Sequence, residues 1–354
     1  MKKAKFLFFF VHPSKYHLFK FLIRHLIAKG FHVDIAIVTK DILEDLIKKE
    51  GWSYTNIFPE GRRISAIPIL LATVINFFRT FWRLVKFTSG KKHDYFLSDD
   101  VLSIIGWLKG VKSYHFQDDD YNAVPESALL LSTANFTFAP DTTDLGQFNS
   151  KKISYNSLHE LAYLHPNRFS PKREILEKYG LNGKKYFVLR LVSLTASHDV
   201  GKKGLNNELV QSLINILQKN GEILITAERK LPQEFEKYRM NISPEDISNV
   251  IYFSDMFIGD SQTMATEAAV MGVPSLRCNS FVGKISSMEE LKKKYKISWG
   301  FLPEDFEKLI EKVEELLSKE DLKLVLKGKR KKMLEDKVDL STFMINYFEK
   351  IALL

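Results

Sequence analysis

Residues 250–279 read VIYFSDMFIGDSQTMATEAAVMGVPSLRCN, and this stretch decides the fold expected for the whole chain. The pattern predicts a buried strand over 256–259, a polar turn, a short helix over 264–271 and then another strand. Gly272 is a typical residue to end a helix, and Pro274 prevents the helix from continuing. A strand, a sharp turn and a helix in this order are typical of parallel α/β sheets, which bind ligands beyond the carboxyl ends of their strands.

The turn carries the polar residues of a predicted anion site. Asp260, Ser261 and Thr263 have short side chains that suit a helix N-terminus, and Gln262 lies between them. The first backbone N–H groups of a helix lack intrahelical acceptors, and the helix dipole favours negative charge, so we expect a phosphate or pyrophosphate here. Glu267 follows within the helix, where its carboxylate can accept two hydroxyls, as from a ribose diol. An ordinary capped helix would explain Ser261 but not the additional polar residues.

This segment resembles the UDP-binding segment of the non-hydrolysing UDP-N-acetylglucosamine 2-epimerases and, more loosely, that of GT-B glycosyltransferases. The chain is also similar to a bacterial and archaeal domain-of-unknown-function family related to both. That similarity extends to HPSKYHLFKFLIRHLIAKGFHV at 12–33, ELAYLHP at 160–166 and LRLVSLTASHDVG at 189–201. It implies an α/β fold of the GT-B type, in which two Rossmann-like doubly wound domains face each other across a cleft.

The length of 354 residues is usual for two α/β domains. We expect a Rossmann-like acceptor domain over 1–165 and a Rossmann-like nucleotide-sugar domain over 166–340. Residues 341–354 are expected to form a terminal helix that crosses back to the first domain. Cys278 is the only cysteine of the sequence, which excludes an intramolecular disulfide and fits a reducing cytoplasm.

The net charge of +9 indicates an anionic partner. No zinc finger, RNA-recognition motif or basic heptad is present in the sequence, so nucleic acid is not an expected partner. A nucleotide sugar together with an anionic membrane surface explains the charge. We therefore expect a cytoplasmic protein, and peripheral attachment at the inner face of the membrane remains an open alternative.

The most hydrophobic stretch is ISAIPILLATVINFFRTFWRLVKF at 64–87. Arg79, Arg83 and Lys86 interrupt it before it reaches the roughly 20 apolar residues that span a bilayer. Two interpretations remain open: an interfacial helix that inserts among lipid headgroups, or a core helix of the first domain. Membrane attachment would suit an enzyme that acts on a lipid-linked acceptor.

Candidate residues of the first domain follow its predicted strands. His12 and Lys15 come after the apolar run at 5–11, and they either contact a phosphate or acceptor or belong to a loop that caps the next helix. The loop lacks a G-x-G-x-x-G pattern, so we expect no NAD site. Asp118 and Asp119 follow a strand over 113–116, and we expect an acceptor-binding group or general base among them. Their spacing is too common to indicate a metal, and no metal is expected.

Four further candidates come from the resemblance or from charge. In the epimerases, a Pro-Glu pair before a similar helix carries a catalytic acid, which implies this role for Glu126; the alternative is an acid that stabilises the first turn of a helix. A histidine of the epimerases faces the nucleotide sugar from a comparable loop of the second domain, which implies His198. Arg190 and Arg277 are candidates for phosphate contact.

Together these features predict a GT-B-type glycosyltransferase that uses a nucleoside-diphosphate sugar, with UDP as the expected nucleotide, in surface-polysaccharide or glycolipid assembly. A carboxylate or histidine of the first domain would deprotonate a lipid-linked or polysaccharide acceptor. The helix N-terminus would stabilise the leaving diphosphate. The nucleotide sugar is a substrate, and no cofactor is expected. A non-hydrolysing UDP-sugar 2-epimerase and a non-catalytic nucleotide-sugar binding protein remain alternatives.

Overall fold

The computed structural model describes residues 3–40, 42–62, 64, 67–193 and 204–353. Contacts between Cα atoms divide the chain into two compact units. The first unit contains Met1–Tyr163 and Val338–Leu354, and the second contains Leu164–Lys337. The last helix, α13 (Leu340–Ala352), therefore belongs to the first unit, although it follows the whole of the second unit in the sequence.

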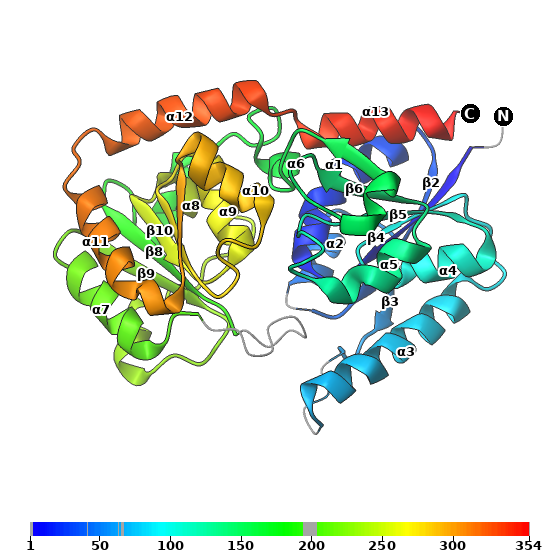
Figure 1. The fold of residues 1–354 in the computed structure, drawn as a ribbon, viewed down its shortest axis with the longest axis horizontal. Coiled ribbons are helices and arrows are strands. Elements are labelled where there is room, and N and C mark those ends of the chain that lie inside the picture. The colour runs from blue at the N-terminus through cyan, green and yellow to red at the C-terminus, as the bar shows by residue number, and fades with distance from the viewer. Residues whose placement is uncertain (1–2, 41, 63, 65–66, 194–203, 354) are drawn as a thin grey trace. The chain divides into compact units, whose positions relative to one another are not determined.

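The first unit contains a parallel sheet of seven strands in the order β3-β2-β1-β4-β5-β6-β7 (Figure 1). The strands are β1 (Lys5–Phe10), β2 (His32–Val38), β3 (Thr55–Phe58), β4 (Tyr95–Ser98), β5 (Lys112–Phe116), β6 (Phe136–Pro140) and β7 (Lys152–Tyr155). The chain first builds outward from β1 to β3 and then returns to β4 on the other side of β1. In doubly wound sheets this reversal leaves a crevice at the carboxyl ends of the two central strands, where ligands bind.

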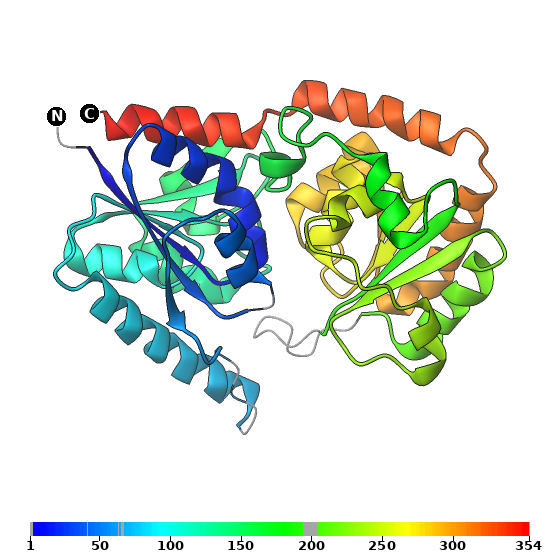
Figure 2. The same ribbon diagram turned by 180° about the vertical axis from the view of Figure 1, so that it is seen from behind.

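The strand β1 shows why this sheet forms, because both of its faces are buried. Leu7 and Phe9 pack in a cluster with Leu84 of helix α3 (Ile69–Thr88) and with residues of α4 (Leu102–Lys109). On the opposite face, Phe8 and Phe10 contact Phe19 of helix α1 (Pro13–Ala28), with ring centroids 5.3 and 5.8 Å apart. Burial on two faces explains the unbroken apolar run in this strand. Both views show α13 beside α1 on this second face (Figures 1 and 2).

The remaining helices of the first unit are short. They are α2 (Leu43–Lys49), α5 (Ala128–Thr133) and α6 (Leu161–Leu164), the last of which lies at the boundary with the second unit. None of the helices within the described residues has the length and apolar character needed to cross a membrane.

The second unit contains a parallel sheet of five strands in the order β12-β11-β10-β8-β9. Its strands are β8 (Tyr186–Leu191), β9 (Glu222–Ala227), β10 (Met256–Gly259), β11 (Ser275–Cys278) and β12 (Ser298–Phe301). Its helices are α7 (Asn207–Leu217), α8 (Ile247–Phe253), α9 (Gln262–Val270), α10 (Ser286–Glu290), α11 (Phe306–Leu317) and α12 (Leu322–Asp336). The strand order reverses between β8 and β10, which places the crevice of this sheet at the start of α9. The two Rossmann-like sheets confirm the predicted fold class.

Candidate active site

A partly buried ion pair lies where the strand order of the first sheet reverses. Lys15 is in the first turn of α1, directly after β1, and Asp99 directly follows β4. The Lys15 Nζ lies 3.5 Å from Asp99 Oδ2, and the two side chains are 12% and 23% exposed. Since β1 and β4 are neighbours in the sheet, their carboxyl ends bring together two residues that are 84 positions apart.

The charge on Lys15 is held by the carboxylates around it. Burial lowers the pKa of Lys15, but Asp99, Asp118 and Asp119 outweigh burial and raise the pKa above its ordinary value. Burial raises the pKa of Asp99, while Lys15 opposes that change. This arrangement favours a role for Lys15 in holding the neighbouring carboxylates in place over a role in phosphate contact.

A second pair consists of Asp118, which follows β5, and His159, which follows β7. His159 Nδ1 lies 3.3 Å from Asp118 Oδ2, and the side chains of His159 and Asp118 are 8% and 40% exposed. Burial raises the pKa of Asp118, but His159 and Lys15 have a larger combined effect and lower it, so Asp118 is a carboxylate at neutral pH. A carboxylate at Nδ1 fixes the tautomer that leaves Nε2 able to accept a proton. His159 has the geometry of an oriented general base.

Several buried polar atoms around these pairs lack a hydrogen-bond partner among the described residues. They are His159 Nε2, Asp99 Oδ1, the Tyr155 hydroxyl and His115 Nδ1. The ring of Tyr155 stacks on that of His159 with centroids 6.2 Å apart. Buried polar atoms are normally paired, so a group of unsatisfied ones indicates a site that a ligand or water completes. We call Lys15, Asp99, Asp118 and His159 the amino-terminal cluster.

The burial of His115 gives a prediction for the dependence of stability on pH. Burial, followed by the charge of Lys15, lowers the pKa of His115 from 6.5 to about 4. The unfolded chain therefore takes up a proton at higher pH than the folded chain, and stability is lost as pH falls from 6.5 towards 4. Since one pKa unit corresponds to about 1.4 kcal/mol, we expect His115 to account for a loss of about 2 to 3 kcal/mol over this window.

Urea unfolding at a series of pH values measures this effect. The H115Q variant should lose less stability than the wild-type protein between pH 6.5 and 4, by about 2 kcal/mol. The H32Q variant is the control, because the His32 side chain is 55% exposed. Equal slopes for H115Q and the wild-type protein would show that His115 does not set this dependence.

In the second unit, the predicted turn at 260–263 begins α9. The Ser261 hydroxyl accepts a hydrogen bond from the backbone N–H of Met264 at 3.3 Å, so Ser261 is the N-cap, and the helix begins two residues earlier than predicted. The described residues provide no acceptor for the backbone N–H groups of Gln262 and Thr263. Backbone N–H groups at the start of a helix are the kind of donor that binds an anion.

The side chain of Asp260 stabilises this turn. Its carboxylate accepts hydrogen bonds from the backbone N–H groups of Val192 at 2.7 Å and Leu205 at 3.3 Å. Its side chain therefore joins β10 to the two ends of the segment that follows β8. Burial raises the pKa of Asp260 to about 6, although the two N–H donors oppose this change. Asp260 acts on the turn through the backbone around it.

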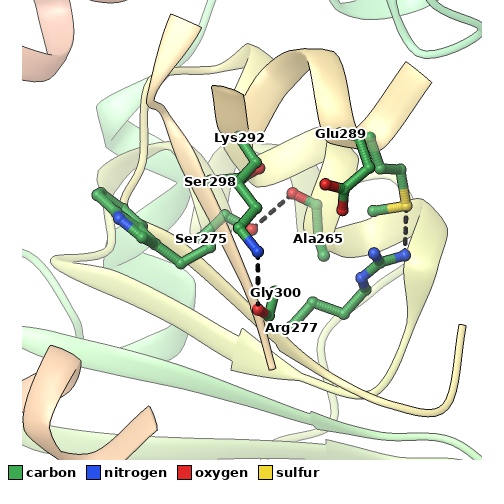
Figure 3. Close-up of a pocket in the computed structure, with 9 residues that line it drawn as sticks. Ala265, Ser275, Arg277, Glu289, Lys292, Ser298 and Gly300 are labelled. Carbon is green, nitrogen blue, oxygen red and sulfur yellow. Dashed lines mark hydrogen bonds between the residues drawn. The ribbon is translucent and has the colours of Figure 1, made fainter. Parts of the chain in front are cut away.

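Glu267 and Arg277 lie further inside the second unit, and they are 7% and 4% exposed. Arg277 Nη1 donates to Gln262 Oε1 at 3.0 Å and also contacts Met288 Sδ. Arg277 lines a small pocket beside α9 (Figure 3). The other lining residues are Ala265, Ser275, Met288, Glu289, Lys292, Ser298, Trp299 and Gly300. Arg277 is therefore connected to the start of α9 through Gln262.

The comparisons with known proteins identify the family of this chain and the fold that it shares with solved structures. The model of the DUF354 family, described as a protein of unknown function, matches residues 14–350. This chain belongs to the DUF354 family. The comparison with curated proteins gives no match.

Solved structures that resemble the DUF354 protein share its two-domain GT-B fold. The UDP-GlcNAc 2-epimerase of Methanocaldococcus jannaschii, in complex with UDP-GlcNAc and UDP, has a TM-score of 0.65 and 14% identity, and the match covers 90% of this chain and 94% of that one. The UDP-GlcNAc 2-epimerase of Neisseria meningitidis, bound to UDP-GlcNAc, has a TM-score of 0.64, 13% identity and 99% coverage of both chains. The glycotransferase of kitacinnamycin has a TM-score of 0.63, 12% identity and 99% coverage of both chains.

The remaining predicted residues of the DUF354 protein have other surroundings. His12 is the N-cap of α1, where its Nδ1 accepts from the Ser14 N–H at 3.2 Å. Glu126 is exposed on a short 3-10 helix (Pro125–Ser127). Arg190 forms an ion pair with Glu228. His198 lies outside the described residues.

Asp99 and His159 are the residues of the amino-terminal cluster for which the sequence predicts no role. The only sequence signal for His159 is its place beside Glu160, just before the second unit. Within the part of the chain that the structure describes, no group of three or more His, Cys, Asp or Glu side chains could hold a metal ion.

Proposed function

We propose that this DUF354 protein is a glycosyltransferase that uses a nucleoside-diphosphate sugar, with UDP as the nucleotide. The observation that supports this most strongly is the Asp118–His159 pair, in which an oriented imidazole keeps a buried Nε2 without a partner among the described residues. A single oriented base is what the transfer of a sugar to a hydroxyl requires. Two structural relatives bind UDP-GlcNAc, which supports UDP as the nucleotide.

In the proposed reaction, His159 Nε2 takes the proton of the acceptor hydroxyl, and the acceptor oxygen forms a bond to C1 of the sugar. The bond between C1 and the diphosphate oxygen breaks, and the nucleoside diphosphate leaves with the electron pair. In the second unit, the N–H groups of Gln262 and Thr263 and the Thr263 hydroxyl have the chemistry to bind the nucleoside diphosphate. Asp118 stabilises the imidazolium that forms.

A UDP-sugar 2-epimerase is the second candidate, and one observation favours it. Asp99, Asp118 and Asp119 all act on the Lys15 ammonium, so several acids lie near one another in the first unit. Elimination of UDP and its addition back to the sugar need more than one acid or base around the ring. A binding protein without chemistry is the third candidate, and it would tolerate the loss of His159.

One assay separates these candidates. The purified protein is incubated with UDP-GlcNAc in heavy water without an acceptor, and the sugar protons are followed by NMR. An epimer with deuterium at C2 would support the epimerase. The transferase would be supported if UDP-GlcNAc stays unchanged without an acceptor, and is consumed with release of UDP once a membrane fraction is added. Absence of any nucleotide binding would contradict both.

Nucleotide binding itself is tested at Glu267. We expect the E267Q variant to bind UDP about 10- to 100-fold more weakly, because hydrogen bonds to a charged group contribute about 1.5 to 3 kcal/mol. Isothermal titration calorimetry measures the affinity, and circular dichroism verifies that the buried amide is tolerated. The E320Q variant, changed at an exposed position, should bind UDP like the wild-type protein. Equal affinities of E267Q and wild type would remove Glu267 from the proposed ribose site.

A further inference from the structure

The helix α3 has apolar residues on two faces. One face packs in the core of the first unit through Leu84, with Phe77, Phe81 and Val85 against the same cluster. The other face carries Leu71, Val74, Phe78 and Trp82, which are 50%, 52%, 55% and 65% exposed. Their spacing of three and four residues aligns them along one side of the helix. We call these four residues the α3 ridge.

An exposed ridge of this kind needs an explanation. Single exposed apolar residues are normal, but a row that includes Phe and Trp marks a surface that contacts another molecule or a membrane. Figures 1 and 2 show α3 along the outside of the first unit, with its first half reaching past the neighbouring helices. The helix α4, which contacts α3, also exposes Trp107 and Leu108, at 66% and 57%.

The charges around the ridge identify its partner. Residues 69–93 contain the cations Arg79, Arg83, Lys86, Lys91 and Lys92 and no carboxylate. Arg79, Arg83 and Lys86 are spaced by four and three residues and therefore form a row along one flank of the ridge. Arg79 and Arg83 share the single carboxylate of Glu60, at 2.8 and 2.6 Å, so this group keeps a net positive charge.

We propose that the α3 ridge docks the first unit on an anionic lipid bilayer, with Phe78 and Trp82 among the headgroups and the flanking cations beside lipid phosphates. A helix with an apolar face edged by cations lies in the interface, and its affinity rises with buried apolar area and with the negative charge of the lipid. A symmetric contact between two copies would bring the same cations together, which repulsion opposes. This proposal does not depend on the reaction that the protein catalyses.

Co-sedimentation of the full-length protein with lipid vesicles tests the proposal. The wild-type protein should bind vesicles that contain phosphatidylglycerol, bind phosphatidylcholine vesicles at least roughly tenfold more weakly, and lose binding as salt is raised. The double variant F78Q/W82Q should bind the anionic vesicles roughly a hundredfold more weakly, because two apolar side chains no longer enter the interface. The K86E variant should bind roughly tenfold more weakly.

Matched controls come from the second unit. L324Q changes an apolar residue that is 73% exposed, and K331E reverses a lysine whose side chain is 80% exposed in the basic run at 327–332. Both controls should bind vesicles like the wild-type protein. A loss of binding in K331E equal to that in K86E would place the contact at α12 and overturn the proposal.

Two other results would also overturn the proposal. One is that F78Q/W82Q binds vesicles like the wild-type protein, and the other is that the wild-type protein is a dimer in solution whereas F78Q/W82Q is a monomer. If F78Q/W82Q does not fold, vesicle binding by the variant L71Q/V74Q is an independent test of the α3 ridge. The affinity for UDP should be unchanged in all of these variants, so failure of membrane docking is distinguishable from failure of the proposed function.

Discussion

The H159A variant is expected to transfer sugar about 10²- to 10⁴-fold more slowly than the wild-type protein, with an unchanged affinity for UDP. General base catalysis by a positioned side chain contributes a factor of this size. His159 lies in the first unit, whereas the N–H groups that we propose bind the nucleotide, at the start of α9, lie in the second. Loss of the imidazole should therefore lower kcat without weakening nucleotide binding. Release of UDP in the presence of acceptor measures kcat, and calorimetry measures binding.

Two variants sharpen this experiment. D118N keeps the shape of the side chain that lies 3.3 Å from His159 but removes its charge. The imidazolium is then no longer stabilised, so kcat should fall by about 10²-fold or more. H32A changes an exposed histidine and should transfer sugar at the wild-type rate. Activity of H159A equal to that of the wild-type protein would remove His159 from the mechanism and would favour another group of the amino-terminal cluster as the base.

The second large effect is expected on stability, at Asp260. The D260A variant leaves the partly buried backbone N–H group of Val192 and the buried one of Leu205 without the acceptors that they have at 2.7 and 3.3 Å. Each orphaned donor costs about 1 to 3 kcal/mol, so we expect the free energy of unfolding to fall by about 2 to 5 kcal/mol. Chemical denaturation followed by circular dichroism measures this loss.

The conservative variant D260N distinguishes the lost acceptors from lost packing. The amide oxygen can accept one of the two N–H groups, but the amide nitrogen cannot accept the other, so D260N should lie between D260A and the wild-type protein. D321A is the control, since Asp321 is exposed and its side chain makes no capping hydrogen bond to α12. A D260A protein as stable as wild type would mean that the two backbone donors find other acceptors, and that Asp260 is not structural.

The sequence predicts those features whose determinants are local. The strand at 256–259 is observed with those bounds, since an apolar run ends at a polar turn, and the helix after it is also found. Short edge strands have no such signal: β3, β7 and β12 have four residues each. Unlike β10, which is equally short but apolar throughout, these three strands contain polar residues, and alternation over four residues is too brief to distinguish a strand from a loop.

The amino-terminal cluster depends on contacts between distant parts of the chain. Asp99 is adjacent to Lys15 because β4 pairs with β1, and His159 reaches Asp118 from the end of β7. Neither pairing leaves a pattern in the residues around it, so the sequence predicts Lys15 and Asp118 as candidates but not their partners. The stretch at 64–87 is a different case, because one face of α3 packs in the core, as the core interpretation predicts, while its other face is exposed, and the interfacial interpretation stays a prediction.

The membership of α13 in the first unit has a consequence for how the protein is made. Phe348 is fully buried and stacks on Phe138 with ring centroids 5.3 Å apart, so the aromatic interior of the first unit is completed by residues near the end of the chain. A ribosome releases those residues only after the whole second unit has been translated. Until then the first unit lacks α13, and part of its aromatic interior is exposed to solvent. Chaperones can bind this exposed surface during that interval.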